Sequence, residues 1–191
     1  MRNVFLLETT TEVLSEDSYV LSYPHLLNYF AGKEVIEPGD VVRGAHMVYG
    51  WMPTILELYP EPGENDLPTA AGILTKAKDG ATLAATELDA LASLVNNSLV
   101  GASKLLHFVA PSKYAIWDSK VYSFVHEKRP HNYRVNNVAA YIEYLELLRH
   151  LATEVEFPPF HASVQAKLGY QVSPMRSLEL VMFLNAPVYG G

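Results

Sequence analysis

Apolar residues recur at spacings of three and four along most of this chain, which is the pattern of amphipathic helices. The pattern is clearest from Val138 to Glu154. One face of that segment carries Ala139, Ile142, Leu145, Leu148 and Leu151. The sequence has no sustained alternation of apolar and polar residues, which would mark a half-buried strand. We therefore expect a mainly α, compact multi-helix fold with about eight to ten helices.

Glycine, proline and polar residues set the expected boundaries of these helices. The expected helices run from Tyr23 to Gly32, from Pro38 to Gly50, from Ala70 to Lys78, from Thr82 or Thr86 to Val95, from Ser103 to Val109, from Ser119 to Val125, to Leu168 after a break at 157–160, and from Ser173 to Leu184. Pro53 should open a further turn that reaches Leu58. Asn96 and Asn97 should form a left-handed break between two helices. The segment 4–7 fits either a short strand or a helical turn.

Residues 59–69, with the sequence YPEPGENDLPT, contain three prolines, a glycine and three acidic residues. Such a composition is typical of a surface segment. We expect one globular unit in a two-lobed arrangement, with lobes at 1–59 and 70–191 joined by a linker at 60–69. A length of 191 residues and a hydrophobic content of 49% suffice for a sizeable core.

Several classes of protein and site are disfavoured by composition. The chain has no cysteine, so neither disulfides nor thiolate metal sites are expected, and an intracellular compartment is the simpler interpretation. Its seven histidines show no close metal-binding spacing, so we expect no metal and no cofactor. No apolar run approaches the roughly 20 residues of a membrane span, and the N-terminal apolar run is too short for a signal peptide. We expect a soluble cytoplasmic protein.

The net charge is −7, which opposes general nucleic-acid binding at long range. The charge is unevenly distributed, however. Between Gly101 and Arg134 six basic residues face two acidic ones, whereas the rest of the chain carries eight basic and nineteen acidic residues. Such a basic segment is compatible with a local phosphate-binding face. A solvated helical surface gives the same count.

The basic segment begins with Gly101 to Val125, GASKLLHFVAPSKYAIWDSKVYSFV, in which Lys104 and Asp118 carry the candidate chemistry. Lys104 is expected in the first turn of an apolar helix, where helix-terminal N–H groups would disfavour its ammonium form. Asp118 precedes another helical segment and is a natural N-cap. The plain alternative is that Lys104 is a solvated lysine and Asp118 only a cap.

These residues resemble the helix-hairpin-helix DNA glycosylase superfamily, in particular the 8-oxoguanine DNA glycosylase/AP lyases. In that superfamily a Gly-x-Gly-x-Lys hairpin is followed, one helix and one loop later, by an aspartate that caps another helix. Here the segments 100–104 and 116–118 stand in those places, with Ala102 in place of the second glycine. The resemblance implies a helix-hairpin-helix element and a base-excision DNA glycosylase with Schiff-base AP lyase activity. It also implies duplex DNA with a modified base as the substrate.

The resemblance further implies roles for individual residues. Lys104 would be the Schiff-base nucleophile, and Asp118 would activate it and stabilise the sugar cation. The hairpin backbone, including Gly101 and Ser103, would bind a DNA phosphate. Additional positive charge for this phosphate would come from Lys113, Lys120 or Arg129.

The everted base would lie toward residues 46–53, where Gly and Pro are expected to interrupt a helix. His46, Tyr49 and Trp51 are the candidate pocket residues, since flat and polarizable side chains suit a planar base. The alternative is a helix–helix corner filled by Trp51 and Met52.

Two other functions remain open. The first is a non-catalytic helix-hairpin-helix module that binds DNA or protein. The second is an α-helical interaction protein that binds no nucleic acid, which fits the acidic total charge. Arg176 and Glu179, three residues apart on the last helix, are expected to form a structural pair.

Overall fold

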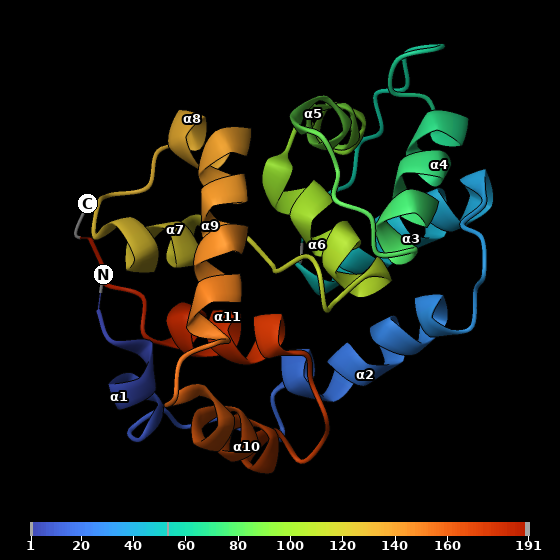
Figure 1. The fold of residues 1–191 in the computed structure, drawn as a ribbon. Coiled ribbons are helices and arrows are strands. Elements are labelled where there is room, and N and C mark those ends of the chain that lie inside the picture. Colours follow the sequence, from blue (N-terminus) through green and yellow to red (C-terminus); the bar gives the residue numbers. More distant parts are fainter. Residues whose placement is uncertain (1, 53, 190–191) are drawn as a thin grey trace.

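The computed structural model of the protein describes residues 2–52 and 54–189. In these ranges the chain forms eleven α-helices and, apart from an isolated bridge between Leu58 and Val95, no β-structure (Figure 1). The helices are α1 (Val4–Glu8), α2 (Ser18–Ala31), α3 (Pro38–Trp51), α4 (Leu67–Lys78), α5 (Ala85–Leu94), α6 (Leu99–Val109), α7 (Ser119–His126), α8 (Asn132–Val135), α9 (Val138–Leu151), α10 (Phe157–Leu168) and α11 (Pro174–Leu184). The prediction of a mainly α fold is confirmed. The helix number exceeds the expected range because α1 and α8, with five and four residues, are too short to show periodicity.

Polar caps and first-turn prolines explain where most of the helices begin. The cap side chains that accept a backbone N–H are Asn3 for α1, Asp17 for α2, Asp66 for α4, Ser98 for α6, Asp118 for α7, Asn137 for α9 and Ser173 for α11. Proline stands in the first turn of α3, α4, α10 and α11. The expected break at 157–160 is therefore wrong, because its prolines occupy the start of α10.

Helix α2 begins five residues before the expected start at Tyr23. Asp17 caps it by accepting the backbone N–H of Tyr19, and Pro24 lies inside the helix. A proline in that position cannot donate to the carbonyl four residues earlier, which belongs to Val20. The hydroxyl of Tyr170 donates to this carbonyl instead, at 2.9 Å. A distant side chain thus makes the internal proline tolerable.

Helix α3 continues through Gly50 to Trp51, so glycine does not interrupt it as expected. Of the expected turn from Pro53 to Leu58, Pro53 lies outside the described residues and 54–58 are not helical. The side chain of Asn96 holds this segment by accepting from the N–H of Glu57 and donating to the carbonyl of Ile55. Asn96 and Asn97 have φ of 56° and 48°, which confirms the left-handed break between α5 and α6.

Helix α9 fixes the connection between α6 and α7 from one side. Its buried face includes Tyr141 and Tyr144, whereas Ala139, which was expected on that face, is exposed. The buried face is therefore rotated about the helix axis relative to the expected one. The two tyrosine hydroxyls donate to the carbonyls of Ala115 and Ile116. These bonds anchor the extended chain immediately before the α7 cap.

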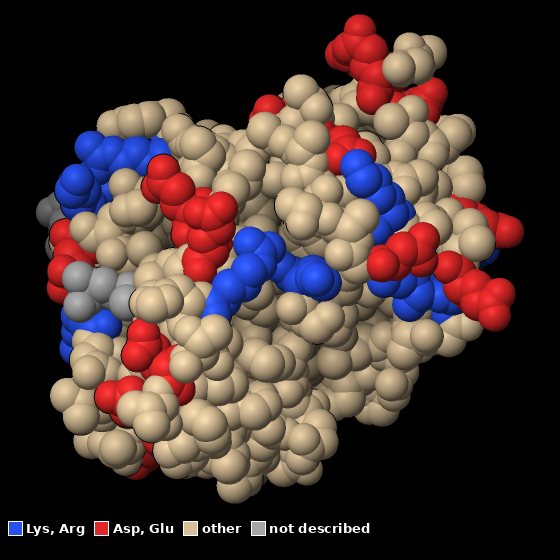
Figure 2. All heavy atoms as spheres, in the orientation of Figure 1, with Lys and Arg blue, Asp and Glu red and all other residues tan. Residues whose placement is uncertain are grey.

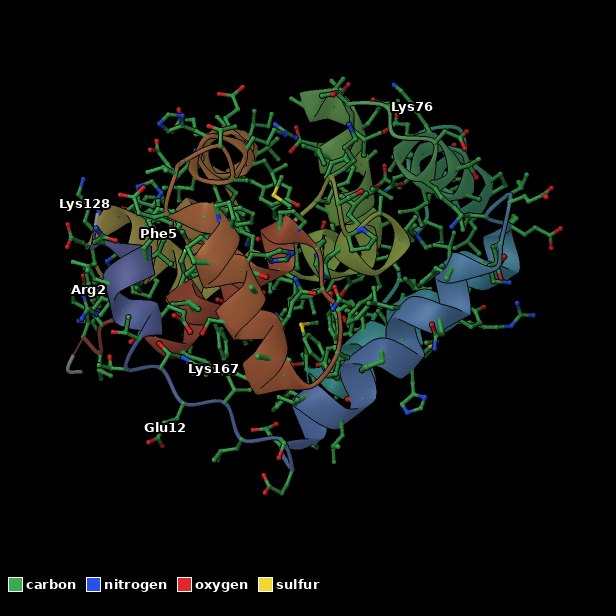
Figure 3. All side chains as sticks on the ribbon, turned by 60° about the horizontal axis from the view of Figure 1, so that its bottom comes forward. Arg2, Phe5, Glu12, Lys76, Lys128 and Lys167 are labelled. Carbon is green, nitrogen blue, oxygen red and sulfur yellow. The ribbon has the colours of Figure 1, made fainter. Side chains whose placement is uncertain are left out.

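The first and the last described residues lie on the same side of the molecule (Figure 1). Helix α1 packs against α10 and α11, with the rings of Phe5 and Phe160 edge to face at 5.3 Å. Lys167 on α10 reaches the segment that follows α1 (Figure 3) and donates to the carbonyls of Glu8 and Thr11. These contacts hold residues 9–17 along the body of the protein, where they form one rim of the cleft described below.

Candidate functional site

A cleft of about 690 Å³ opens among α2, α3, α6, α7, α8 and α11. Its charged or aromatic lining residues include Glu12, Asp17, Tyr19, Trp51, Lys104, Asp118, His131, Arg176, Glu179 and Phe183. Four of the charged residues, Lys104, Asp118, Arg176 and Glu179, are buried. Buried charges are costly unless they are paired, and a cleft that gathers four of them is a candidate functional site.

Lys104 lies in the second turn of α6, not in the first as expected, because Ser98 caps the helix and Leu99 begins it. The helix N-terminus therefore does not set its protonation. The residue is 9% exposed. Burial lowers the pKa of the Lys104 amine; the charges of Asp118 and Glu179 oppose this shift, and that of Arg176 adds to it.

Asp118 is the N-cap of α7, as predicted, and it uses its two carboxylate oxygens differently. Oδ1 accepts the backbone N–H groups of Lys120 and Val121 at 2.9 and 3.0 Å. Oδ2 lies 3.9 Å from the Lys104 Nζ. Because the cap fixes the carboxylate at a helix end, one oxygen faces the lysine while the other is occupied by the backbone.

Ser103 ties the two residues together through the backbone. Its hydroxyl, one position before Lys104, accepts the N–H of Trp117 at 3.1 Å and lies 3.2 Å from the Trp117 carbonyl. The Trp117 indole in turn donates to the carbonyl of Val135 at 2.8 Å. The position of Asp118 relative to Lys104 is thus set by contacts of completely buried residues.

Arg176 and Glu179 form a buried ion pair one helical turn apart on α11. Burial raises the pKa of Glu179 to about 7, although the charge and hydrogen bond of Arg176 favour the ionised form. The guanidinium carbon of Arg176 lies 4.8 Å from the Tyr23 ring centre and 5.9 Å from that of Trp51. The guanidinium of Arg176 therefore lies close to two aromatic rings at the base of the cleft.

Two hydrogen bonds connect Tyr23 through His107 to the backbone of Tyr114. The Tyr23 hydroxyl lies 2.7 Å from Nε2 of His107, and Nδ1 of His107 lies 2.7 Å from the carbonyl of Tyr114. A carbonyl can only accept, so Nδ1 carries the proton and Nε2 accepts from Tyr23. Burial lowers the pKa of His107 to about 3, which keeps the ring neutral. This histidine is structural.

The structure separates the residues expected to bind phosphate. The N–H of Gly101 donates to the Ser98 cap, and Gly101 packs against Tyr49. Ser103 is completely buried and bonded as described above. Neither residue is placed to bind a phosphate, because the backbone and hydroxyl groups that would do so face the interior.

The three expected cationic residues are exposed, in different places. Lys120 lies beside the cleft, with its Nζ 4.2 Å from the ring centre of Phe183, a lining residue. Arg129 immediately precedes the lining residues 130–132. Lys113 does not line the cleft; it lies near Gly80. Lys120 can therefore add charge at the mouth, and Arg129 is next to lining residues in the chain, whereas Lys113 lies elsewhere.

Of the expected base-pocket residues, only Trp51 lines the cleft. Its ring meets Tyr19 and Phe108 edge to face at 5.4 and 5.3 Å. Tyr49 is buried against α6 and His46 is exposed, and neither is a lining residue. The reason is the continuation of α3 through Gly50: at 100° per residue, positions 46 and 49 lie about 140° and 160° away from position 51.

The sequence interpretation missed the place of Arg176 and Glu179 in the site. It expected their pairing, which the structure shows, but not that both line the same cleft as Lys104. A usable signal was present: the two charges interrupt a helix that is otherwise apolar on most sides. Buried charges in such a helix are more often functional than exposed ones.

Within residues 2–52 and 54–189, no group of three histidine or acidic side chains is arranged to hold a metal ion. No helix in the same ranges is long and apolar enough to cross a bilayer. Comparison of the chain with protein-family models, with characterised proteins and with solved structures finds no match. The arrangement therefore has to be interpreted from its own chemistry: a buried amine beside a fixed carboxylate, in a cleft with an aromatic wall.

Proposed function

We propose that this protein is a DNA N-glycosylase with AP lyase activity, which removes a modified base from duplex DNA. The observation that carries the proposal is the pairing of a largely buried lysine with a capping aspartate, 3.9 Å apart, in a cleft of about 690 Å³. The volume lies in the usual range of small-molecule sites and is large enough for an everted nucleotide. The resemblance of residues 100–118 to the glycosylase motif supports the same reaction.

The first step needs a neutral amine at Lys104. Burial favours this form, and Arg176 disfavours a second cation nearby. The lone pair of Nζ attacks C1′ of the deoxyribose while the bond from C1′ to the base breaks. The base leaves with the bonding electrons and takes up a proton, and Nζ loses one. Asp118 stabilises the positive charge that develops on the sugar during this exchange.

The second step opens the sugar. The nitrogen lone pair forms a C=N bond to C1′ as the C1′–O4′ bond breaks and O4′ takes a proton. Loss of a proton from C2′ then expels the 3′ phosphate by β-elimination. Lys104 remains bound as an imine until water releases it, which makes the intermediate reducible by borohydride.

DNA would approach over the mouth of the cleft, near Lys120 and Arg129. On the face in Figure 2, basic groups form small clusters among acidic ones, not one continuous basic surface. The net charge of −7 predicts binding with few phosphate contacts. We expect weak affinity for undamaged DNA and a shallow dependence on salt.

The test is reductive trapping. The protein is incubated with duplexes that carry an abasic site or one of several modified bases, and borohydride is added. We expect a covalent complex with wild type and with Lys113→Gln, a control at an exposed lysine away from the cleft, and none with Lys104→Gln. Trapping that persists in Lys104→Gln would overturn the proposal.

Binding without trapping would have a different meaning. Salt-dependent binding to duplex DNA by wild type, with no covalent complex on any substrate, would favour a non-catalytic DNA-binding module. Absence of binding at low salt would leave an α-helical interaction protein. Both results would contradict the proposed reaction.

A further inference from the structure

The hydrogen-bonding groups at the base of the cleft differ in how many partners they already have. An arginine side chain offers five N–H donors in a rigid plane. For Arg176, the described residues supply one acceptor to this plane, Glu179. The plane itself is held against the ring of Tyr23. Because Arg176 lines the cleft, its remaining donors are the fixed donor edge of the site.

Most of the carboxylate oxygens of Asp118 and Glu179 at the base of the cleft already face a donor or a cation. Glu179 accepts from Arg176, and Oδ1 of Asp118 accepts two backbone N–H groups. Oδ2 of Asp118 faces the Lys104 amine. The indole nitrogen of Trp51 has no partner within the described part of the chain, but it is buried and is not available to a ligand. A ligand edge that faces Arg176 therefore meets unused donors and must present acceptors to them.

The charges at the base of the cleft bear on whether such a ligand is an anion. Arg176 brings one positive charge, Lys104 brings a second when it is protonated, and Asp118 and Glu179 can carry two negative charges. A phosphate would meet both positive and negative side chains, so it would gain little electrostatic binding energy. A neutral planar group with carbonyl oxygens meets no such repulsion and can stack on the aromatic wall that includes Trp51.

We infer that Arg176 makes this cleft selective for bases whose edge presents carbonyl oxygens, such as hypoxanthine and uracil, over the corresponding amino-substituted bases, adenine and cytosine. The inference rests on the proposed function and names its substrate class. A planar guanidinium can donate to two acceptors on one base edge, and such a pair discriminates by about 1–3 kcal/mol against the wrong base, or roughly 5- to 150-fold. Glu179 acts as a positioning residue that keeps the guanidinium in its plane.

The test uses duplexes that cannot be cleaved. Fluorine at C2′ of the target nucleotide disfavours the sugar cation, so binding is measured without reaction. Dissociation constants are determined for four otherwise identical duplexes with hypoxanthine, adenine, uracil or cytosine at that nucleotide. For each pair, adenine with hypoxanthine and cytosine with uracil, the dissociation constant of the amino base is divided by that of the oxo base. The quotient reported is this ratio in wild type divided by the same ratio in Arg176→Lys. Differences in duplex stability cancel in this quotient, because both proteins bind the same DNA.

We expect the quotient to be about 5 or more, because lysine keeps the charge but loses the planar fork. A quotient within about twofold of unity would overturn the inference. If Arg176→Lys does not fold, the double variant Arg176→Met with Glu179→Met replaces it. This variant leaves no buried unpaired charge, and it should lose the same discrimination.

Failure of the inference can be told apart from failure of the proposed function. Trapping of the wild type on an abasic-site duplex does not involve a base, so it tests the proposed function alone. If the wild type traps but the quotient is near unity, only the base selectivity is wrong. If wild type neither traps nor binds any of the duplexes, both proposals fall.

Discussion

Gly101→Ala is the substitution for which the structure gives the sharpest expectation. A Cβ at position 101 would lie 2.3 Å from the hydroxyl oxygen of Tyr49 and 2.9 Å from two of its ring carbons. Tyr49 is buried and cannot move away freely. Overpacking of this kind costs about 1–3 kcal/mol, and the better helix propensity of alanine returns about 0.5–1. We expect a net loss of about 1–2 kcal/mol in the free energy of unfolding.

The measurement is urea unfolding, with thermal unfolding as a second probe. For a chain of this length, each kcal/mol lowers the melting temperature by about 2–4 °C. Gly72→Ala is the matched control: Gly72 also lies inside a helix, but a Cβ there meets nothing within 4 Å. The control should gain about 0.5–1 kcal/mol. In the double variant with Tyr49→Phe, the loss at Gly101 should shrink, because the nearest atom is gone.

The prediction is that the two glycine substitutions change the free energy of unfolding in opposite directions. Gly101→Ala as stable as wild type, or stabilised like Gly72→Ala, would refute the packing argument.

Three further predictions concern His107, Tyr170 and Asp118. The pKa of His107 falls from 6.5 to about 3 on folding. Between these pH values the unfolded chain binds more protons than the folded one, so the free energy of unfolding declines as the pH falls from 6.5 to 3. His107→Gln should therefore lose less stability than wild type between pH 7 and 4, and equal losses would contradict this. Tyr170→Phe leaves the Val20 carbonyl without its hydroxyl partner and should cost about 1 kcal/mol in urea unfolding, whereas an unchanged midpoint would contradict that bond. Asp118→Asn preserves a good cap and should change stability by less than about 1 kcal/mol. It should nevertheless slow trapping on the order of 100-fold, and an unaffected rate would argue against an electrostatic role.

Local signals in the sequence predicted the segments around the site well. Asn96 and Asn97 take the expected left-handed conformation, and Asp118 caps α7 as expected. Both outcomes depend on the short-range chemistry of a turn and a cap, which neighbouring residues determine. That Lys104 and Asp118 line one cleft followed from the resemblance of their segment, not from periodicity.

Other features depend on partners far along the chain, which periodicity cannot reveal. Tyr23-Pro24 is a stronger local start signal than Asp17. Asp17 nevertheless caps α2, which begins at Ser18, because the hydroxyl of Tyr170 donates to the carbonyl that Pro24 leaves free. Long-range hydrogen bonds of this kind override local preferences.

The same limit applies to the site residues. Gly50 is helical within α3, so the aromatic residues around it point to different sides, and Trp51 alone of the three expected residues faces the cleft. Arg176 and Glu179 enter the site because α11 packs against α7. The sequence indicated that Arg176 and Glu179 pair, because they are three residues apart in a helix, but it did not indicate which residues of other helices lie beside them.

The central claim is that Lys104 forms the covalent bond to DNA, and peptide mapping of the trapped complex tests it most directly. Trypsin does not cleave after a modified lysine, so an adduct at Lys104 yields a single peptide of residues 79–113 that carries the reduced sugar. We predict this peptide in wild type after incubation with an abasic-site duplex and borohydride. A reduced adduct on any other lysine, with the peptide ending at Lys104 unmodified, would contradict the account.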